Sequence, residues 1–137
     1  MPSQQGLNTD ELDFENTWNS LSASFREIHT KNASKLSYEE LYRFAYRIVL
    51  KKKGEILYTR VREFEREWLT DNVCTGIKGL LTTSLLTSPG PGGASITERR
   101  DAGERFLQGL KQAWQDHQLC MNMLADVLMY LVRWYGE

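Results

Sequence analysis

The sequence predicts an all-α fold, a bundle of four or five helices, and two observations support this prediction. Apolar residues recur at spacings of three and four along most of the 137 residues, which is the period of one helix face. No segment shows the strict apolar–polar alternation that is typical of a half-buried strand. A chain of this length can bury a core of its own without disulfides or metals.

The N-terminal part is expected to hold a flexible lead and a first helix. Residues 1–12 are polar and predict the lead, and the helix is expected over about 13–31. Its apolar side chains recur at spacings of four and three in one narrow stripe, Phe14, Trp18, Leu21, Phe25 and Ile28. The polar segment TKNASK then predicts a turn.

A second helix is expected over about 37–53. Ser37 is followed three residues later by Glu40, which is the capping-box pattern of a helix start. The segment KKKG predicts its end, with lysines in the last turn and Gly54 just beyond them. Cations suit the negative end of the helix dipole, and glycine readily takes the left-handed conformation that ends many helices.

The remaining chain predicts two longer helices joined by a loop. The helices are expected over about 55–86 and about 97–134, the second with a bend near the DHQ segment. Between them, TSPGPGGAS contains two prolines and three glycines, so a flexible surface loop is expected at about 87–96.

The second predicted helix has a wide apolar arc. Tyr38, Tyr42 and Tyr46 follow one another at intervals of four, and they widen the arc to roughly 240°, against about 100° or more for a helix that packs on one side. Both halves of the arc are core in one interpretation. In the other, the tyrosines form a protein-binding surface, since a tyrosine buries its ring while its hydroxyl stays paired or hydrated. Periodicity leaves both interpretations open, as it does for the aromatic C-terminus around Tyr130 and Arg133.

Composition excludes several classes of function. Seventeen basic and eighteen acidic residues give a net charge of −1, so neither nucleic acid nor a membrane surface is an expected partner. No apolar run approaches the roughly 18 residues of a membrane span, and the protein is expected to be soluble. Two cysteines without a signal-peptide pattern suggest reduced thiols and a cytoplasmic or nuclear location.

Candidate catalytic groups are sparse. His29 and His117 lack a Ser or Cys in a recognisable nucleophile motif. His117 and Cys120 lie three residues apart and can share a helix face, but a structural zinc site needs two further ligands. We therefore expect no metal, no cofactor and no enzymatic activity, and a small metal-dependent enzyme is the weakest of the alternatives.

Three segments together resemble the cullin family. LSYEELYRFAYRIVLKKKGEILY, residues 36–58, resembles the start of a cullin, most closely of the third cullin type, whose partners are BTB-domain adaptors. FENTWNSL, residues 14–21, is similar to the first cullin helix. FLQGLKQAWQDHQLCMNMLADVLMYLVRWY, residues 106–135, resembles a later helix and the segment after it. The resemblance covers about residues 10–135.

The resemblance implies that residues 13–135 are the front part of the first cullin repeat. Such a module is a non-catalytic scaffold of a cullin–RING E3 ubiquitin ligase that holds a BTB-domain substrate adaptor. The adaptor-binding residues would be Leu36, Ser37, Tyr38, Glu39, Tyr42, Tyr46, Tyr130 and Arg133. The alternative from another class is a self-contained structural or assembly domain whose tyrosines are all core.

The sequence also departs from the family pattern. The family usually has a longer basic N-terminal extension, and TSPGPGGASITERR is longer than the family's connection. The resemblance implies that the later repeats and the regions that bind a RING-box protein, recruit the E2 and carry the neddylation site would follow residue 137 in a full cullin. We therefore expect adaptor binding without ubiquitin transfer, and some self-association at the C-terminus.

Overall fold

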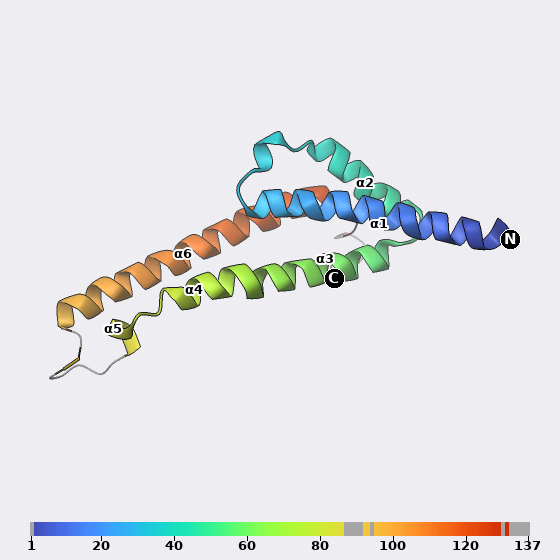
Figure 1. The fold of residues 1–137 in the computed structure, drawn as a ribbon. Helices are drawn as coiled ribbons and strands as arrows, with labels where there is room; N and C mark the ends of the chain where they lie inside the picture. The colour runs from blue at the N-terminus through green and yellow to red at the C-terminus, as the bar shows by residue number, and fades with distance from the viewer. Residues whose placement is uncertain (1, 87–91, 94, 130, 132–137) are drawn as a thin grey trace. The chain divides into compact units, whose positions relative to one another are not determined.

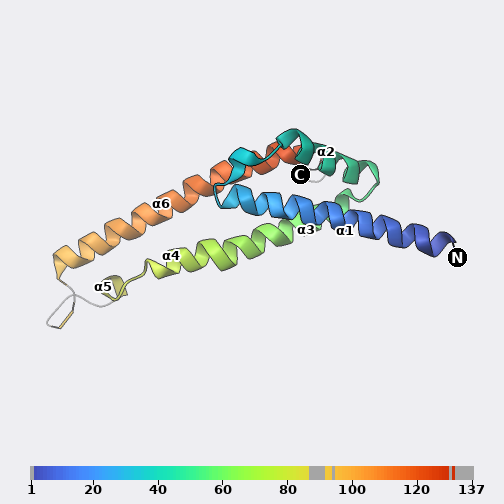
Figure 2. The same cartoon turned by 45° about the horizontal axis from the view of Figure 1, so that its top comes forward.

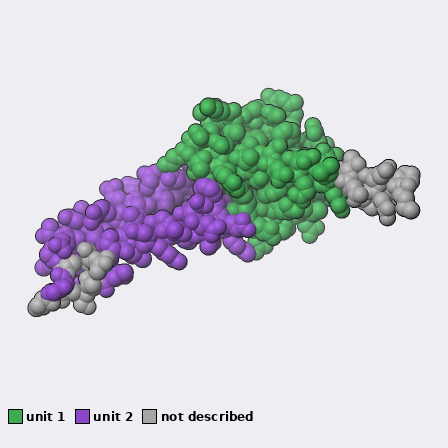
Figure 3. All heavy atoms as spheres, in the orientation of Figure 1, with its two compact units in different colours: residues 1–64, 120–137 green, residues 65–119 purple. Residues whose placement is uncertain are grey.

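The structure is a computed structural model, and it describes residues 2–86, 92–93, 95–129 and 131. These residues contain six α-helices, one 3₁₀ turn and one π-helical stretch, and no strand (Figure 1). The predicted all-α fold is confirmed. The chain divides into two compact units, Met1–Phe64 with Cys120–Glu137 and Glu65–Leu119 (Figure 3).

Helix α1 spans Pro2–His29, and all five residues of the predicted stripe are buried. The first helix was predicted to begin at about residue 13, after a flexible lead over 1–12, but in the structure α1 already begins at Pro2. Proline is favourable at the first helical position, where its missing N–H would have no helical partner and its fixed φ is already helical. Among residues 3–10, Gly6 has the lowest helix propensity.

Both α1 and α2 (Tyr38–Leu50) end in the same hydrogen-bonded motif, but neither uses glycine. Lys31 and Lys52 take the left-handed conformation with φ of 64° and 62°. Beyond α2, the amide of Lys53 donates to the Ile48 carbonyl at 3.1 Å and that of Lys52 to Val49 at 3.0 Å, which is a Schellman motif. The helix was predicted to run to about residue 53 with Gly54 as its left-handed end, but it ends at Leu50 and Lys52 takes that conformation, while Gly54 is buried and begins α3 (Gly54–Trp68).

Replacing Lys52 by glycine is expected to raise the free energy of unfolding by about 0.5–1 kcal/mol, because glycine accepts the left-handed conformation without steric cost. The same gain is expected for Lys31→Gly. Urea unfolding followed by circular dichroism measures both. In contrast, Arg62→Gly at an exposed position inside α3 should cost about 1 kcal/mol. A loss of stability in Lys52→Gly would contradict the left-handed assignment.

The predicted uninterrupted helix over 55–86 is divided in the structure. After α3 follow a π-helical stretch (η2, Leu69–Cys74), α4 (Thr75–Gly79) and α5 (Thr83–Leu86). The Thr75 hydroxyl donates to the Thr70 carbonyl at 3.4 Å, five residues earlier, which matches the wider π repeat. The segment TDNVCTG is poor in good helix formers, so little intrinsic propensity opposes the break.

Helix α6 spans Ile96–Val127, close to the predicted start. The Ser95 hydroxyl caps it by accepting from the Glu98 amide at 3.1 Å. Within the unit Glu65–Leu119, Ala102 is buried and Gly109 lies so close to Leu80 that a Cβ there would overlap Leu80 Cδ1. Trp114, an expected apolar-face residue, is 60% exposed. The predicted loop at 87–96 and the predicted helix end beyond 129 lie partly outside the described residues.

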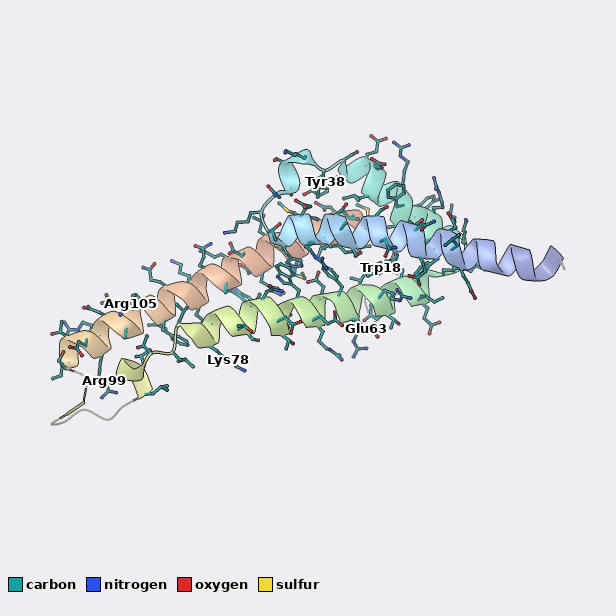
Figure 4. The ribbon with its side chains drawn as sticks, in the orientation of Figure 1. Trp18, Tyr38, Glu63, Lys78, Arg99 and Arg105 are labelled. Atoms are coloured by element: carbon teal, nitrogen blue, oxygen red, sulfur yellow. The ribbon has the colours of Figure 1, made fainter. Side chains whose placement is uncertain are left out.

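The core of the other unit is built by α1, α2, the start of α3 and the end of α6. Figures 1 and 2 show α2 running beside α1, and these two helices are in contact. Trp18 of α1 (Figure 4) packs edge-on against Phe25 and Phe64. The buried residues are Phe14, Trp18, Leu21, Phe25, Ile28, Leu41, Ala45, Ile48, Leu57, Cys120, Leu124, Val127, Leu128 and Leu131.

Candidate protein-binding surface on α2

Helix α2 begins at a well-defined cap. Ser37 has an extended backbone, and its side-chain oxygen accepts from the amide of Glu40 at 3.3 Å. Its carbonyl accepts from the Leu41 amide at 3.1 Å. Glu39 and Glu40 place negative charge in the first turn, where the helix dipole favours it. The sequence therefore fixes the start of α2 locally, as the capping pattern predicts.

The inner face of α2 belongs to the core. Leu41, Ala45 and Ile48 are buried, and the half-buried ring of Tyr38 (Figure 4) also packs against this core. Leu36, just before the helix, does the same. The core interpretation therefore applies to Tyr38, although its side chain remains partly accessible.

Tyr42 and Tyr46 form the outer part of the arc. Their rings stack with centroids 6.2 Å apart and planes at 8°, and Tyr46 is 37% exposed. Tyr42 is half-buried, so the stack presents part of two adjacent rings, and rings that already pack on each other lose less side-chain entropy on binding. Beside it, Arg43 donates to Glu39 at 3.2 Å, and this exposed pair contributes about 0.5 kcal/mol or less.

Charged contacts join α1 to Lys51, the residue directly after α2, and to Arg60 in the middle of α3. Lys51 donates to Asp13 at 2.6 Å. This hydrogen bond and the charge of Lys51 hold the pKa of Asp13 below its ordinary value of 3.8. Arg60 of α3 donates to both carboxylate oxygens of Glu15, at 2.6 and 3.3 Å. Lys53 and Arg60 also approach the ring of Phe14, at 5.9 and 5.7 Å from its centroid.

His117 and Cys120, the two residues weighed as metal ligands, each contact a residue that is not a metal ligand. The His117 ring lies 6.0 Å from that of Trp114. Cys120 is buried, and its thiol lies 3.7 Å from the Ile28 carbonyl as a weak donor. Among the described residues, no three or more His, Cys, Asp or Glu side chains are placed to hold a metal ion. Within the same part of the chain, no helix combines the length and apolar character needed to cross a bilayer.

Six of the eight residues that the family resemblance nominates can be placed. They gather on α2 and directly before it, Leu36, Ser37, Tyr38, Glu39, Tyr42 and Tyr46. Tyr130 and Arg133 lie outside the described residues. The sequence reasoning gave no role to Leu50, which is 62% exposed in the last turn of α2. The signal was present, because Leu50 continues the interval of four that joins the tyrosines.

Comparison with known proteins assigns the fold to a family. Residues 18–137 match the cullin α-solenoid domain. The chain is 35% identical over 138 residues to Cullin-3 of Schizosaccharomyces pombe, covering 96% of this chain and 18% of that protein. It is 35% identical over 119 residues to Cullin-3 of Dictyostelium discoideum, covering 87% of this chain and 13% of the relative.

A plant relative gives the same result. Cullin-3B of Arabidopsis thaliana is 38% identical over 119 residues, which cover 87% of this chain and 13% of the plant protein. The chain thus spans less than a fifth of the length of these relatives. The matched domain covers nearly the whole chain and agrees with its all-α architecture. This chain belongs to the cullin family.

Proposed function

We propose that this chain is the adaptor-binding module of a cullin scaffold in a cullin–RING ubiquitin ligase, and that its partner is a BTB-domain substrate adaptor. The module itself carries no catalysis. A RING-box protein and the E2 would bind other parts of a full-length cullin. The proposal includes a cytoplasmic or nuclear location for the assembly.

The stacked pair Tyr42–Tyr46 is the observation that carries this proposal. It lies beside the core face of α2, and Tyr46 is more than a third exposed. Aromatic side chains with arginine nearby are the residues that most often dominate binding energy at protein interfaces. Further support comes from the relatives, which bear the name Cullin-3, and from the motif over residues 36–58, which resembles the cullin type that binds BTB adaptors.

The proposal is tested by calorimetric titration of the chain with a purified BTB-domain adaptor. We expect saturable binding with one adaptor domain per chain. Trp114→Ala is the matched control, because Trp114 is a 60% exposed aromatic residue in the other compact unit. This variant should bind as the unmodified chain does. Absence of saturable heat with the folded chain would refute the proposal, and equal loss in Trp114→Ala would point to non-specific aromatic adhesion.

The self-contained assembly domain is the competing function. The position of Tyr38 supports this alternative, because its half-buried ring packs against the core. It does not account for the exposed part of the stack, since a self-contained bundle would gain by burying the ring of Tyr46, which is 37% exposed. A folded chain that binds no adaptor would favour this alternative.

A further inference from the structure

Leu50 extends the proposed adaptor surface by one helical turn. It is 62% exposed and follows Tyr46 by four residues, as Tyr46 follows Tyr42. Each step of four rotates the position by only about 40° around the helix. Tyr42, Tyr46 and Leu50 therefore form an apolar strip that winds away from the core face of α2, with Leu50 nearly opposite the buried Leu41.

The backbone at Leu50 is fixed although its side chain is exposed. The Schellman motif directly after it bonds the amides of Lys52 and Lys53 to the carbonyls of Val49 and Ile48, on either side of the turn that carries Leu50. The Lys51–Asp13 ion pair holds the next residue against α1. An exposed leucine on an ordered helix end loses less conformational freedom on binding than one on a frayed end.

Exposure alone would not single out Leu50, because isolated exposed leucines are ordinary on protein surfaces. Leu12 and Leu107 are exposed to a similar degree, 62% and 64%. Neither continues a stacked pair of tyrosines along its own helix. The position of Leu50 in line with the Tyr42–Tyr46 stack is what distinguishes it.

The charges around Leu50 indicate the chemistry of its partner surface. The segment RIVLKKK, residues 47–53, contains four basic residues and no acidic one. Asp13 accepts from Lys51 and also feels the charge of Arg47, but the side chains of Arg47 and Lys52 are both exposed at this end of the helix. A complementary surface would offer an apolar pocket for the leucine and carboxylates for the basic residues.

We propose that Leu50 is an anchor residue of this surface, and that it inserts into an apolar pocket of the adaptor bordered by Asp or Glu side chains. This inference rests on the proposed function. It adds to that function a residue that the family resemblance did not nominate, and it states the charge of the region that receives it.

The test is titration of a purified BTB-domain adaptor with Leu50→Ala and, as the matched control, Leu107→Ala. Alanine keeps helix propensity high, so both variants should melt like the unmodified chain. Leu50→Ala is expected to weaken the Kd about tenfold, which corresponds to about 1.4 kcal/mol, while Leu107→Ala leaves it unchanged. Arg47→Gln should reduce the dependence of the Kd on salt concentration, because one charge pair is removed.

The outcomes separate the inference from the function on which it rests. If the unmodified chain binds and Leu50→Ala binds equally well, Leu50 is no anchor and the adaptor surface ends at Tyr46. If Arg47→Gln leaves the salt dependence unchanged, the acidic border is refuted. If the unmodified folded chain binds no adaptor, the proposed function fails and the inference fails with it.

Discussion

Replacing Phe25 by alanine is expected to lower the free energy of unfolding by about 3–5 kcal/mol. Phe25 is fully buried, and its ring meets those of Trp18 and Phe64 edge-on, with centroids 6.2 and 6.0 Å away. The substitution removes buried apolar area and two edge-to-face contacts, one of which joins α1 to α3, and it leaves a cavity. Because small domains are stable by only about 5–15 kcal/mol, the loss is a large fraction of the total.

Urea unfolding followed by circular dichroism measures this loss, with Leu12→Ala as the control on the same helix. Leu12 is 62% exposed, so its replacement should change stability by no more than about 0.5 kcal/mol. A loss below about 1 kcal/mol for Phe25→Ala would mean that α1 does not pack through this ring, and the core as described would be wrong. If Phe25→Ala is unfolded without urea, Phe25→Leu gives a smaller and measurable loss.

The helices that the sequence predicts best are those whose signals are local. The stripe of α1 and the cap at Ser37 are read from residues three and four apart, and both are present in the structure. The ends of helices were less predictable. Gly54 has the right residue type for a left-handed end, but the Schellman motif closes at Lys52, two residues earlier, which the residue type alone does not reveal.

The predicted helix over 55–86 is divided because α-helical and π-helical hydrogen bonding compete within it, and apolar periodicity does not distinguish between them. Apolar spacing continues through the segment, yet η2 replaces the α-helix at Leu69–Cys74 and α4 ends at Gly79. An inserted π turn shifts the register of the following residues by a fraction of a turn, so an apolar pattern survives it. The pattern therefore locates helical segments but not the breaks between them.

The candidate site could be located from the sequence but not divided into core and surface. The spacing places Tyr38, Tyr42 and Tyr46 on neighbouring positions of one helix. Which of them faces the core depends on how α2 lies on α1, and that is a property of tertiary packing. Tyr38 contacts the core, whereas Tyr42 and Tyr46 stack on each other.

Tyr42→Ala is expected to weaken binding of a BTB-domain adaptor by about 2 kcal/mol, or roughly thirtyfold in Kd. The change removes one ring of the stack, and with it the ring contact that Tyr46 makes with Tyr42. The helix itself should persist, because alanine has the highest helix propensity and Leu41, Ala45 and Ile48 keep α2 on the core. Calorimetric titration gives the affinity, and circular dichroism gives the helix content.

The matched control is Tyr58→Ala, which removes a tyrosine that is 38% exposed on α3, close to the 37% of Tyr46. It should leave the affinity unchanged, so a loss specific to Tyr42 cannot be ascribed to removing any partly exposed ring. Tyr42→Phe then separates the ring from the hydroxyl, and retained affinity in that variant assigns the binding energy to the stacked surface. If Tyr42→Ala instead unfolds the domain, Tyr42 belongs to the core, and the proposed adaptor surface loses its central residue and is refuted.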